Sequence, residues 1–175
     1  MYDLAALRIS LMTLSPRQST LSTVSFPGRK TTQKWRQRRD PLWRGDTVPL
    51  TRPVPGADGA IVRHVLFLDG PGRPTPFHSA TESRRTAEHF AGPGGKVYET
   101  YVTSVEEVGA RHISHIELLG LLRGKGHGKA KWHSAFEVLQ ARRKVEEHIE
   151  HLFDFVALEG LTDAEIGALV SGLYR

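Results

Sequence analysis

The chain has 175 residues, of which 39% are hydrophobic and 25% charged, and a formal net charge of +5. These values fit one folded domain with its own core. The absence of cysteine excludes disulfides and cysteine-based metal sites or nucleophiles. No apolar run approaches the roughly 18 residues of a membrane span, and no basic residues precede the apolar N-terminal segment. We therefore expect no membrane association, and a location that is cytoplasmic or secreted without a recognisable signal peptide.

The positive charge is concentrated in the first third of the chain. Residues 1–60 carry ten Lys and Arg against four Asp and Glu, a balance of +6, whereas residues 61–175 carry fourteen against fifteen, a balance of −1. Six basic residues surround Trp35 between positions 29 and 39. This composition suits phosphate contact with base stacking, and it equally suits a solvated, flexible leader. We assign residues 1–40 to a basic, flexible N-terminal arm and residues 41–175 to a single domain.

Four segments have the composition of β-strands. β-branched and aromatic residues dominate residues 61–68, and the Gly/Pro-rich turn that follows predicts a hairpin with the next strand. The last of the four segments shows the period-2 alternation of a half-buried strand. The predicted strands cover residues 42–46, 61–68, 75–80 and 96–103.

Helical patterns occupy most of the remaining domain. Ser83 can cap the first helix, and Gly92-Pro93 ends it. An amphipathic stripe predicts one long helix from His133 to Val156, and Thr162-Asp163-Ala164-Glu165 is a capping box that opens the last helix. The predicted fold is α+β, a small mixed or antiparallel sheet with flanking helices. The predicted helices cover residues 82–91, 114–122, 133–156 and 162–173.

Polar side chains on two of the predicted strands are candidates for ligand binding. Ser79 and Thr81 are two residues apart, so their hydroxyl groups would share one face of an extended segment. They can hold a polar ligand beside the start of a helix, or they are simply polar residues of a strand with no role in binding. Arg44 can bind a phosphate through its planar donor fork, or it forms a surface ion pair with Asp46.

The order of four segments resembles the ADP-ribosyltransferases of the Arg–Ser–Glu type, which include bacterial exotoxins. The resemblance covers roughly residues 41–140. It implies an ADP-ribosyltransferase-like fold and a toxin or effector that transfers ADP-ribose from NAD to a protein or nucleic-acid acceptor. The four segments are Leu42-Trp43-Arg44-Gly45-Asp46, Ser79-Ala80-Thr81 with the helix after it, the strand 96–103, and a glycine-rich loop followed by Ala135-Phe136-Glu137-Val138.

The resemblance also implies roles for individual residues of the first two segments. Arg44 would bind a phosphate of NAD, and Gly45 would let the ligand approach the backbone closely. Ser79 would bond near the nicotinamide ribose and position the catalytic acid. Thr81 would support the geometry of the strand.

Glu137 would be the catalytic residue, which favours the positive charge that develops as nicotinamide leaves. Glu117 is the alternative acid. In the family the catalytic glutamate lies on a strand, whereas Glu137 and Glu117 both lie in helical patterns in this sequence. Ala135 stands two positions before Glu137, where arginine-modifying members carry Glu or Gln, so the resemblance does not imply arginine as the acceptor.

The glycine-rich loop lies where the family has its target-recognition loop. The residues that would contact the acceptor are Lys125, Lys129, Lys131 and Trp132. An alternative function is a non-catalytic nucleic-acid-binding protein that uses the basic arm and the loop 123–132. A third interpretation is an interaction protein whose helix 133–156 pairs with a partner helix. The nine histidines form no metal-binding motif, so we expect no metal, and the oligomeric state stays open.

Overall fold

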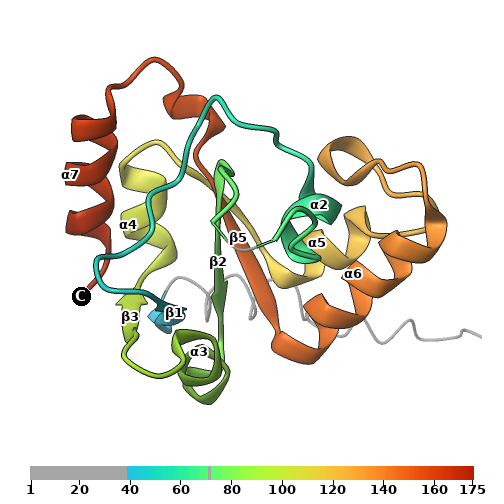
Figure 1. The fold of residues 1–175 in the computed structure, drawn as a ribbon, viewed down its shortest axis with the longest axis horizontal. Helices are drawn as coiled ribbons and strands as arrows, with labels where there is room; N and C mark the ends of the chain where they lie inside the picture. The colour runs from blue at the N-terminus through green and yellow to red at the C-terminus, as the bar shows by residue number, and fades with distance from the viewer. Residues whose placement is uncertain (1–38, 71) are drawn as a thin grey trace, which may run out of the picture.

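The computed structural model describes residues 39–175, apart from residue 71. Its five strands form one antiparallel sheet in the order β3-β1-β2-β5-β4, with helices on both sides (Figure 1). The predicted α+β class is confirmed. The N-terminal arm lies outside the described residues up to residue 38. The strands are β1 Leu42–Asp46, β2 Phe77–Thr81, β3 Lys96–Thr100, β4 Arg111–Ile113 and β5 Glu150–Asp154.

Six α-helices and two short 3-10 turns complete the described part of the chain. None of the helices in residues 39–175 is long and apolar enough to cross a bilayer. The helices are α2 Ile61–Val65, α3 Arg84–Ala91, α4 Val102–Glu107, α5 His115–Leu121, α6 Ala135–His148 and α7 Asp163–Leu173, and the 3-10 turns cover Gly128–Ala130 and Val156–Leu158.

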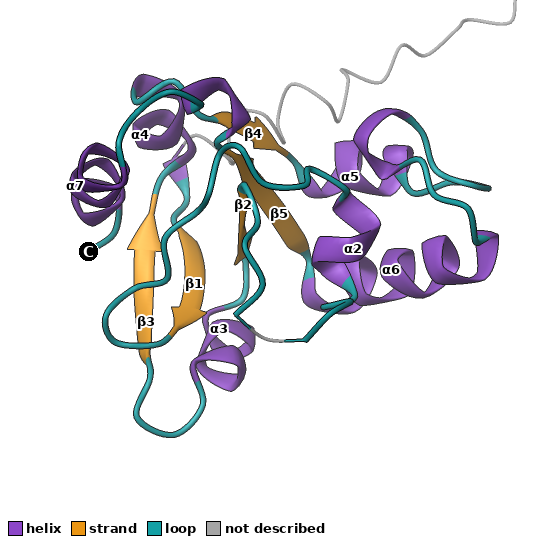
Figure 2. Ribbon diagram, turned by 45° about the horizontal axis from the view of Figure 1, so that its top comes forward, coloured by secondary structure: helices purple, strands orange, loops and turns teal. Residues whose placement is uncertain are grey.

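Two hydrophobic cores lie on opposite faces of the sheet. Because successive residues of a strand point to opposite sides, β5 contributes Leu152 to one core and Phe153 to the other. The core that contains Phe153 also takes residues from α4 and α7, and the core that contains Leu152 takes residues from α2, α5 and α6. Figure 2 shows these two groups of helices on either side of the strands.

Several sequence signals for helix ends are confirmed. Ser83 caps α3, with its hydroxyl accepting from the Thr86 N–H at 3.2 Å. Gly92 follows the helix with a positive φ of 62°, a backbone conformation that favours glycine. Thr162 and Glu165 form the predicted capping box at the start of α7. These signals are local, which is why the sequence alone reveals them.

The predicted strand over residues 61–68 is wrong, and so is the hairpin built on it. Residues Ile61–Val65 form helix α2, and β2 pairs with β1 and β5 instead. A short apolar run fits a buried helix turn as well as a strand, since neither period can be read from so few residues. Here Ile61, Val62 and Val65 form one buried helical face.

The predicted long helix over residues 133–156 is also wrong in its second half. Helix α6 ends at His148, Ile149 adopts a left-handed conformation with φ 47°, and Glu150–Asp154 form strand β5. All five residues of β5 are buried, so the strand lacks the alternation that would have distinguished it from a helix. The predicted strand 96–103 similarly ends at Thr100, because α4 begins at Val102.

Strand β1 is joined closely to one neighbour and loosely to the other. It pairs along its whole length with β3, but its described ladder with β2 contains a single residue pair, Trp43 with Thr81. Beyond that pair the second half of β1 and the first half of β2 separate. Both halves line the cavity that holds the candidate site.

Candidate functional site

A cavity of about 520 Å³ lies between β1, β2 and the helices α2, α3 and α6. This volume falls within the roughly 300–1,000 Å³ typical of small-molecule sites. All four residues that the resemblance implies for NAD binding line this cavity. They are Arg44, Gly45, Ser79 and Thr81.

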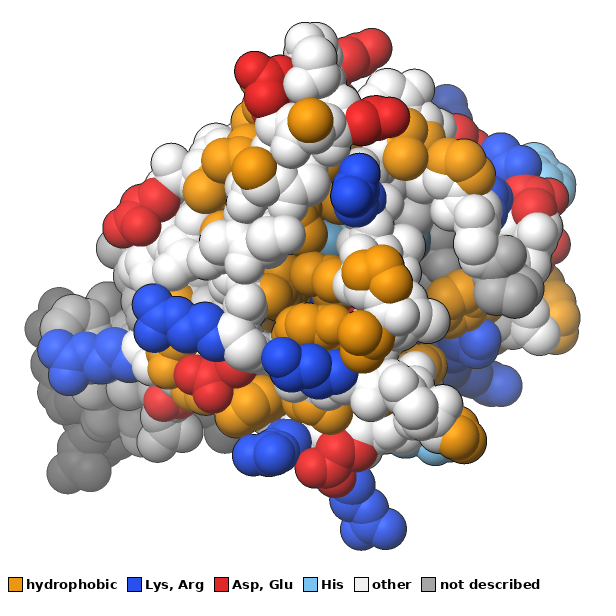
Figure 3. Space-filling view, turned by 60° about the vertical axis from the view of Figure 1, so that its left-hand side comes forward, with side chains coloured by type: hydrophobic (Ala, Val, Ile, Leu, Met, Phe, Trp, Pro, Cys, Tyr) orange, Lys and Arg blue, Asp and Glu red, His pale blue; other side chains and the backbone are white. Residues whose placement is uncertain are grey.

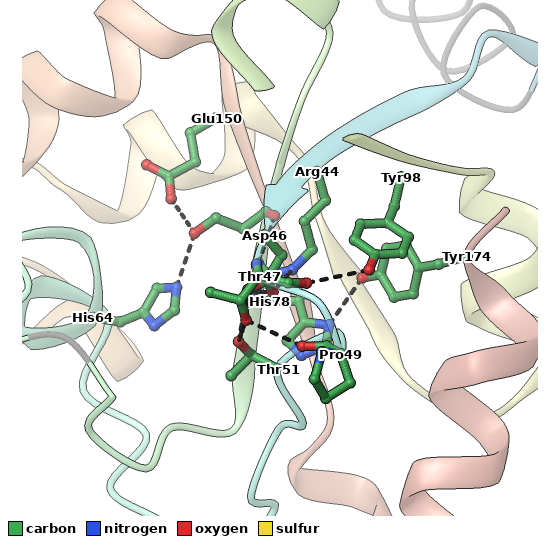
Figure 4. A network of polar contacts seen from close by, with 11 residues as sticks. Arg44, Asp46, Thr47, Pro49, Thr51, His64, His78, Tyr98, Glu150 and Tyr174 are labelled. Atoms are coloured by element: carbon green, nitrogen blue, oxygen red, sulfur yellow. Dashed lines mark hydrogen bonds and ion pairs between the residues drawn. The ribbon is translucent and has the colours of Figure 1, made fainter. Parts of the chain in front are cut away.

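Ser79 is hydrogen-bonded to a glutamate at the start of the neighbouring strand. The register of β2 against β5 pairs Thr81 with Glu150 and Ser79 with Leu152, so the Ser79 and Glu150 side chains share a face of the sheet. The Ser79 Oγ donates to Glu150 Oε1 at 2.6 Å (Figure 4). Both residues line the cavity.

Glu150 is buried, with 8% of the residue exposed. Burial raises the pKa of Glu150 to about 7, against the opposing effects of the Ser79 hydrogen bond and of the Lys144 and Arg44 charges. A carboxyl group with this pKa changes its charge near neutral pH, which suits a group that acts in catalysis.

Arg44 connects the two separated strands. Its Nη1 donates to the Ser79 backbone carbonyl at 3.0 Å, and its Nε and Nη2 donate to Asp46 Oδ2 at 2.8 and 2.5 Å. Burial would raise the pKa of Asp46, but the Arg44 charge and hydrogen bonds from Thr51 and Thr47 hold it below its usual value. Asp46 therefore stays ionised and fixes the guanidinium group. Within the described residues, two of the five guanidinium N–H groups make no hydrogen bond and can bind an anion.

Thr81 bonds to two backbone groups at the end of β2. Its hydroxyl donates to the His148 backbone carbonyl at 2.5 Å and accepts from the Ser83 N–H at 3.1 Å. His148 ends α6, and the left-handed Ile149 then turns the chain into Glu150. Thr81 thus holds the turn that brings Glu150 to the cavity.

Gly45 has a packing role that the sequence did not reveal. A Cβ atom at this position would lie 1.8 Å from the Ala87 carbonyl oxygen and 2.5 Å from the Ala91 nitrogen, both in α3. The resemblance implied that Gly45 lets a ligand approach the backbone closely. In the structure the missing side chain lets α3 pack against β1, and Gly45 also lines the cavity.

We expect Gly45→Ala to lower the free energy of unfolding by about 2 kcal/mol, because overpacking against backbone atoms forces α3 away from the strand. Urea denaturation would measure the loss. Gly172→Ala in α7 is the matched control, since nothing lies within 4 Å of its added Cβ, and alanine there should gain up to about 1 kcal/mol. Equal stability of Gly45→Ala and the wild type would contradict this account of the packing.

Glu137, the predicted catalytic residue, does not line the cavity. It lies in the first turn of α6, and its Oε2 accepts from the Trp132 Nε1–H at 2.5 Å. The alternative acid, Glu117, lies on α5 in an ion pair with Arg111. The structure therefore brings neither of them to Ser79. The acid that does reach Ser79 is Glu150, which the sequence interpretation missed because it treated β5 as helix.

The glycine-rich loop is anchored at two of its four predicted recognition residues. The Lys129 ammonium group pairs with Asp154 at 2.5 Å, and half-buried Trp132 packs on the core beside Glu137. Lys125 and Lys131 are exposed. Contact of these two lysines with an acceptor stays a prediction.

The nucleic-acid-binding alternative depends mainly on the arm, and residues 1–38 lie outside the described part of the chain. On the face seen in Figure 3, Lys and Arg side chains are interspersed with Asp, Glu and hydrophobic side chains. Nucleic-acid binding therefore also stays a prediction.

Two exposed aromatic rings stand at the cavity. Phe67 is 55% and Phe90 45% exposed, and both line the cavity wall. The Lys144 ammonium group lies 5.7 Å from the Phe67 ring centroid, and the His148 ring lies 4.9 Å from the Phe90 ring. Because Lys144 and His148 are four residues apart on α6, the two phenyl rings flank successive turns of one helix face. Such rings can stack on a flat aromatic ligand.

The charged residues of the wall favour an anionic ligand. Four basic side chains face two acidic ones, of which Glu150 is only partly ionised at neutral pH. The basic residues are Arg44, Arg52, Arg73 and Lys144, and the acidic ones are Asp46 and Glu150. Among the described residues, no group of three His, Asp or Glu has the arrangement of a metal site.

The chain matches no protein-family model, and no curated protein and no solved structure is significantly similar to it. Interpretation of the site therefore rests on its residues and their geometry.

Proposed function

We propose that this protein is an ADP-ribosyltransferase that uses NAD as its donor and a protein or nucleic acid as its acceptor. The observation that carries the proposal is the meeting of three side chains at one cavity. Ser79 Oγ lies 2.6 Å from Glu150 Oε1, and Arg44 Nη1 lies 3.0 Å from the Ser79 carbonyl oxygen. In this proposal Glu150 has the catalytic role that the resemblance implied for Glu137.

The chemistry of the transfer calls for a carboxylate in this place. As the bond between nicotinamide and ribose C1′ breaks, its electron pair stays on the nicotinamide nitrogen and positive charge develops on the ribose. A fixed, buried carboxylate stabilises that charge better than water does. The acceptor then forms a bond to C1′ and releases a proton, which Glu150 can take up because burial raises its pKa to about 7.

The basic residues of the cavity suit the donor. The pyrophosphate of NAD carries two negative charges, and a guanidinium group binds phosphate oxygens through paired N–H groups. Arg44 is held in place by Asp46 and keeps donors available, and Arg52 and Arg73 line the same cavity.

The exposed aromatic rings suit the flat groups at the two ends of NAD. Phe67 and Phe90 line the cavity on one face of α6. Their faces offer stacking surfaces for a nicotinamide or adenine ring. A cavity with aromatic walls and a few polar groups is the usual form of a cofactor site.

Release of nicotinamide from NAD tests the proposal. We expect Ser79→Ala to lower the rate about 10- to 100-fold, because the hydroxyl group that holds Glu150 is lost. Ser171→Ala is the control: among the described residues, this exposed serine of α7 bonds only within its own helix, to the Gly167 carbonyl, and it should retain the wild-type rate. Equal rates for Ser79→Ala and the wild type would argue against a role for the Ser79–Glu150 pair.

A further inference from the structure

His64 joins the Ser79–Glu150 pair from a third element of the fold. It lies on α2, and its Nε2 is 2.9 Å from Ser79 Oγ, while its Nδ1 is 3.0 Å from Thr75 Oγ1. In Figure 4, dashed lines join the His64 ring and the Glu150 carboxyl group to the same hydroxyl oxygen, Ser79 Oγ. A continuous set of hydrogen bonds therefore runs from Thr75 through His64 and Ser79 to Glu150, and we call it the His64 hydrogen-bond chain.

The Glu150 end of this chain imposes one direction on its protons, and the Thr75 end is compatible with that direction. At the first end, the Phe77 backbone N–H, which can only donate, points to Thr75 Oγ1 at 3.3 Å. The Thr75 hydroxyl proton is then available to His64 Nδ1. At the other end, an ionised Glu150 can only accept, so the Ser79 proton lies toward Glu150 Oε1.

Ser79 Oγ must then accept its second hydrogen bond, and His64 Nε2 is the atom that donates it. A neutral imidazole has one donor and one acceptor nitrogen, which matches these two neighbours. Burial, with the charges of Arg44 and Arg73, lowers the pKa of His64 to about 3, so the ring is neutral at every pH at which the site would act.

We infer that His64 is a positioning residue that directs the Ser79 hydroxyl proton to Glu150 and thereby favours the ionised carboxylate. The inference rests on the proposed function only for its catalytic consequence. The arrangement is not that of a serine hydrolase, in which the histidine stands between the serine and the acid. Here the serine stands between the histidine and the acid.

Other charged and titratable groups line the cavity with Glu150, and the test must hold them constant. They come from β1, β2 and α6, and from the segments before α2 and before β2. They are Arg44, Asp46, Arg52, Arg73, His78, Lys144 and His148. Substitutions confined to His64 leave all seven in place.

The first measurement uses the wild-type protein. Nitrogen-15 NMR of the histidine side chains reports which ring nitrogen carries the proton, and His64→Gln identifies the signal. Above about pH 8, where Glu150 is mostly ionised, we expect a proton on His64 Nε2 and none on Nδ1. A proton on Nδ1 under these conditions would overturn the inference, and this measurement needs no destabilising substitution.

The second measurement is the titration of Glu150 by carbon-13 NMR of labelled glutamate, with Glu150→Gln assigning the signal. His64→Leu removes the donor to Ser79 Oγ, so the Ser79 hydroxyl proton is no longer directed to Glu150 and the bond from Ser79 to the ionised carboxylate weakens. We therefore expect the midpoint to rise by about one pH unit. His64→Gln keeps an N–H group near the position of Nε2 and should titrate close to the wild type. An unchanged midpoint in a folded His64→Leu protein would overturn the inference.

These two NMR measurements do not depend on NAD. If the wild type released no nicotinamide while the midpoint still moved in His64→Leu, the hydrogen-bond chain would stand and the proposed function would fail. If the wild type releases nicotinamide and the midpoint also moves in His64→Leu, the acidic limb of the pH profile of kcat/KM should shift to higher pH in that variant, by the same amount as the NMR midpoint. This is expected because the profile of kcat/KM reports the pKa values of the free enzyme.

Discussion

Replacement of Glu150 by glutamine is expected to lower kcat for nicotinamide release about 10²–10³-fold, with little change in KM for NAD. Glutamine keeps the size of the side chain and can still accept from Ser79, so the site should keep its shape. What is lost is the negative charge beside the ribose, which matters only when positive charge develops there. An effect on kcat with an unchanged KM is the signature of such an interaction.

Glu137→Gln is the matched control for this change. Glu137 bonds to Trp132 and lies outside the cavity wall, so the same substitution should leave kcat within about twofold of the wild type. Steady-state kinetics of both variants separate the two glutamates. A large loss of kcat in Glu137→Gln with none in Glu150→Gln would instead support the catalytic role that the resemblance implied for Glu137.

The second large expected effect is that Glu150→Gln stabilises the protein at alkaline pH. Burial raises the pKa of Glu150 from its usual 4.5 to about 7 in the folded state. Between these two values the unfolded chain releases a proton that the folded protein retains, so wild-type stability falls as pH rises. Above about pH 7 the wild type has lost about 3 kcal/mol of its free energy of unfolding through this group, at 1.36 kcal/mol per pH unit of pKa shift.

Glutamine carries no charge at any pH, so the variant should lack this loss. We expect its free energy of unfolding to exceed that of the wild type by about 3 kcal/mol at pH 8 and by less than about 1 kcal/mol at pH 5. Urea denaturation at a series of pH values measures the difference. Parallel stability curves for the two proteins would mean that Glu150 is not buried as described.

The parts of the fold that the sequence predicts correctly are those with local signals. Strand β1, strand β2 and helices α3 and α7 have their expected positions, within a few residues at each end. The caps of α3 and α7 follow from hydroxyl side chains at the right spacing from the first helical turn. Such signals depend on residues only a few positions apart, so they survive in any tertiary setting.

The parts that the sequence misses depend on the whole fold. Strand β5 is buried on both faces because helices cover both sides of the sheet, and a strand of this kind has no alternation to reveal it. Helix α2 is too short for a helical period to be read. Both errors follow from tertiary contacts that no short segment specifies.

The residues of the candidate site fall into the same two groups, those in elements that the sequence predicts correctly and those in elements that it does not. Arg44, Ser79 and Thr81 could be predicted because each lies on a strand that the sequence identifies. Glu150 and His64 could not, because each lies in an element assigned to the wrong class and meets Ser79 through contacts across the fold. In the ADP-ribosyltransferases that the sequence resembles, the catalytic glutamate lies on a strand. Had β5 been recognised as a strand, this feature would have directed attention to Glu150.

The most direct test of the proposed reaction is the amount of nicotinamide released from NAD by the purified protein at about pH 8, with cell extract as the source of acceptors. The account predicts release by the wild type and by Glu137→Gln, and release near background for Glu150→Gln. No nicotinamide from the wild type, or equal amounts from the wild type and Glu150→Gln, would contradict it.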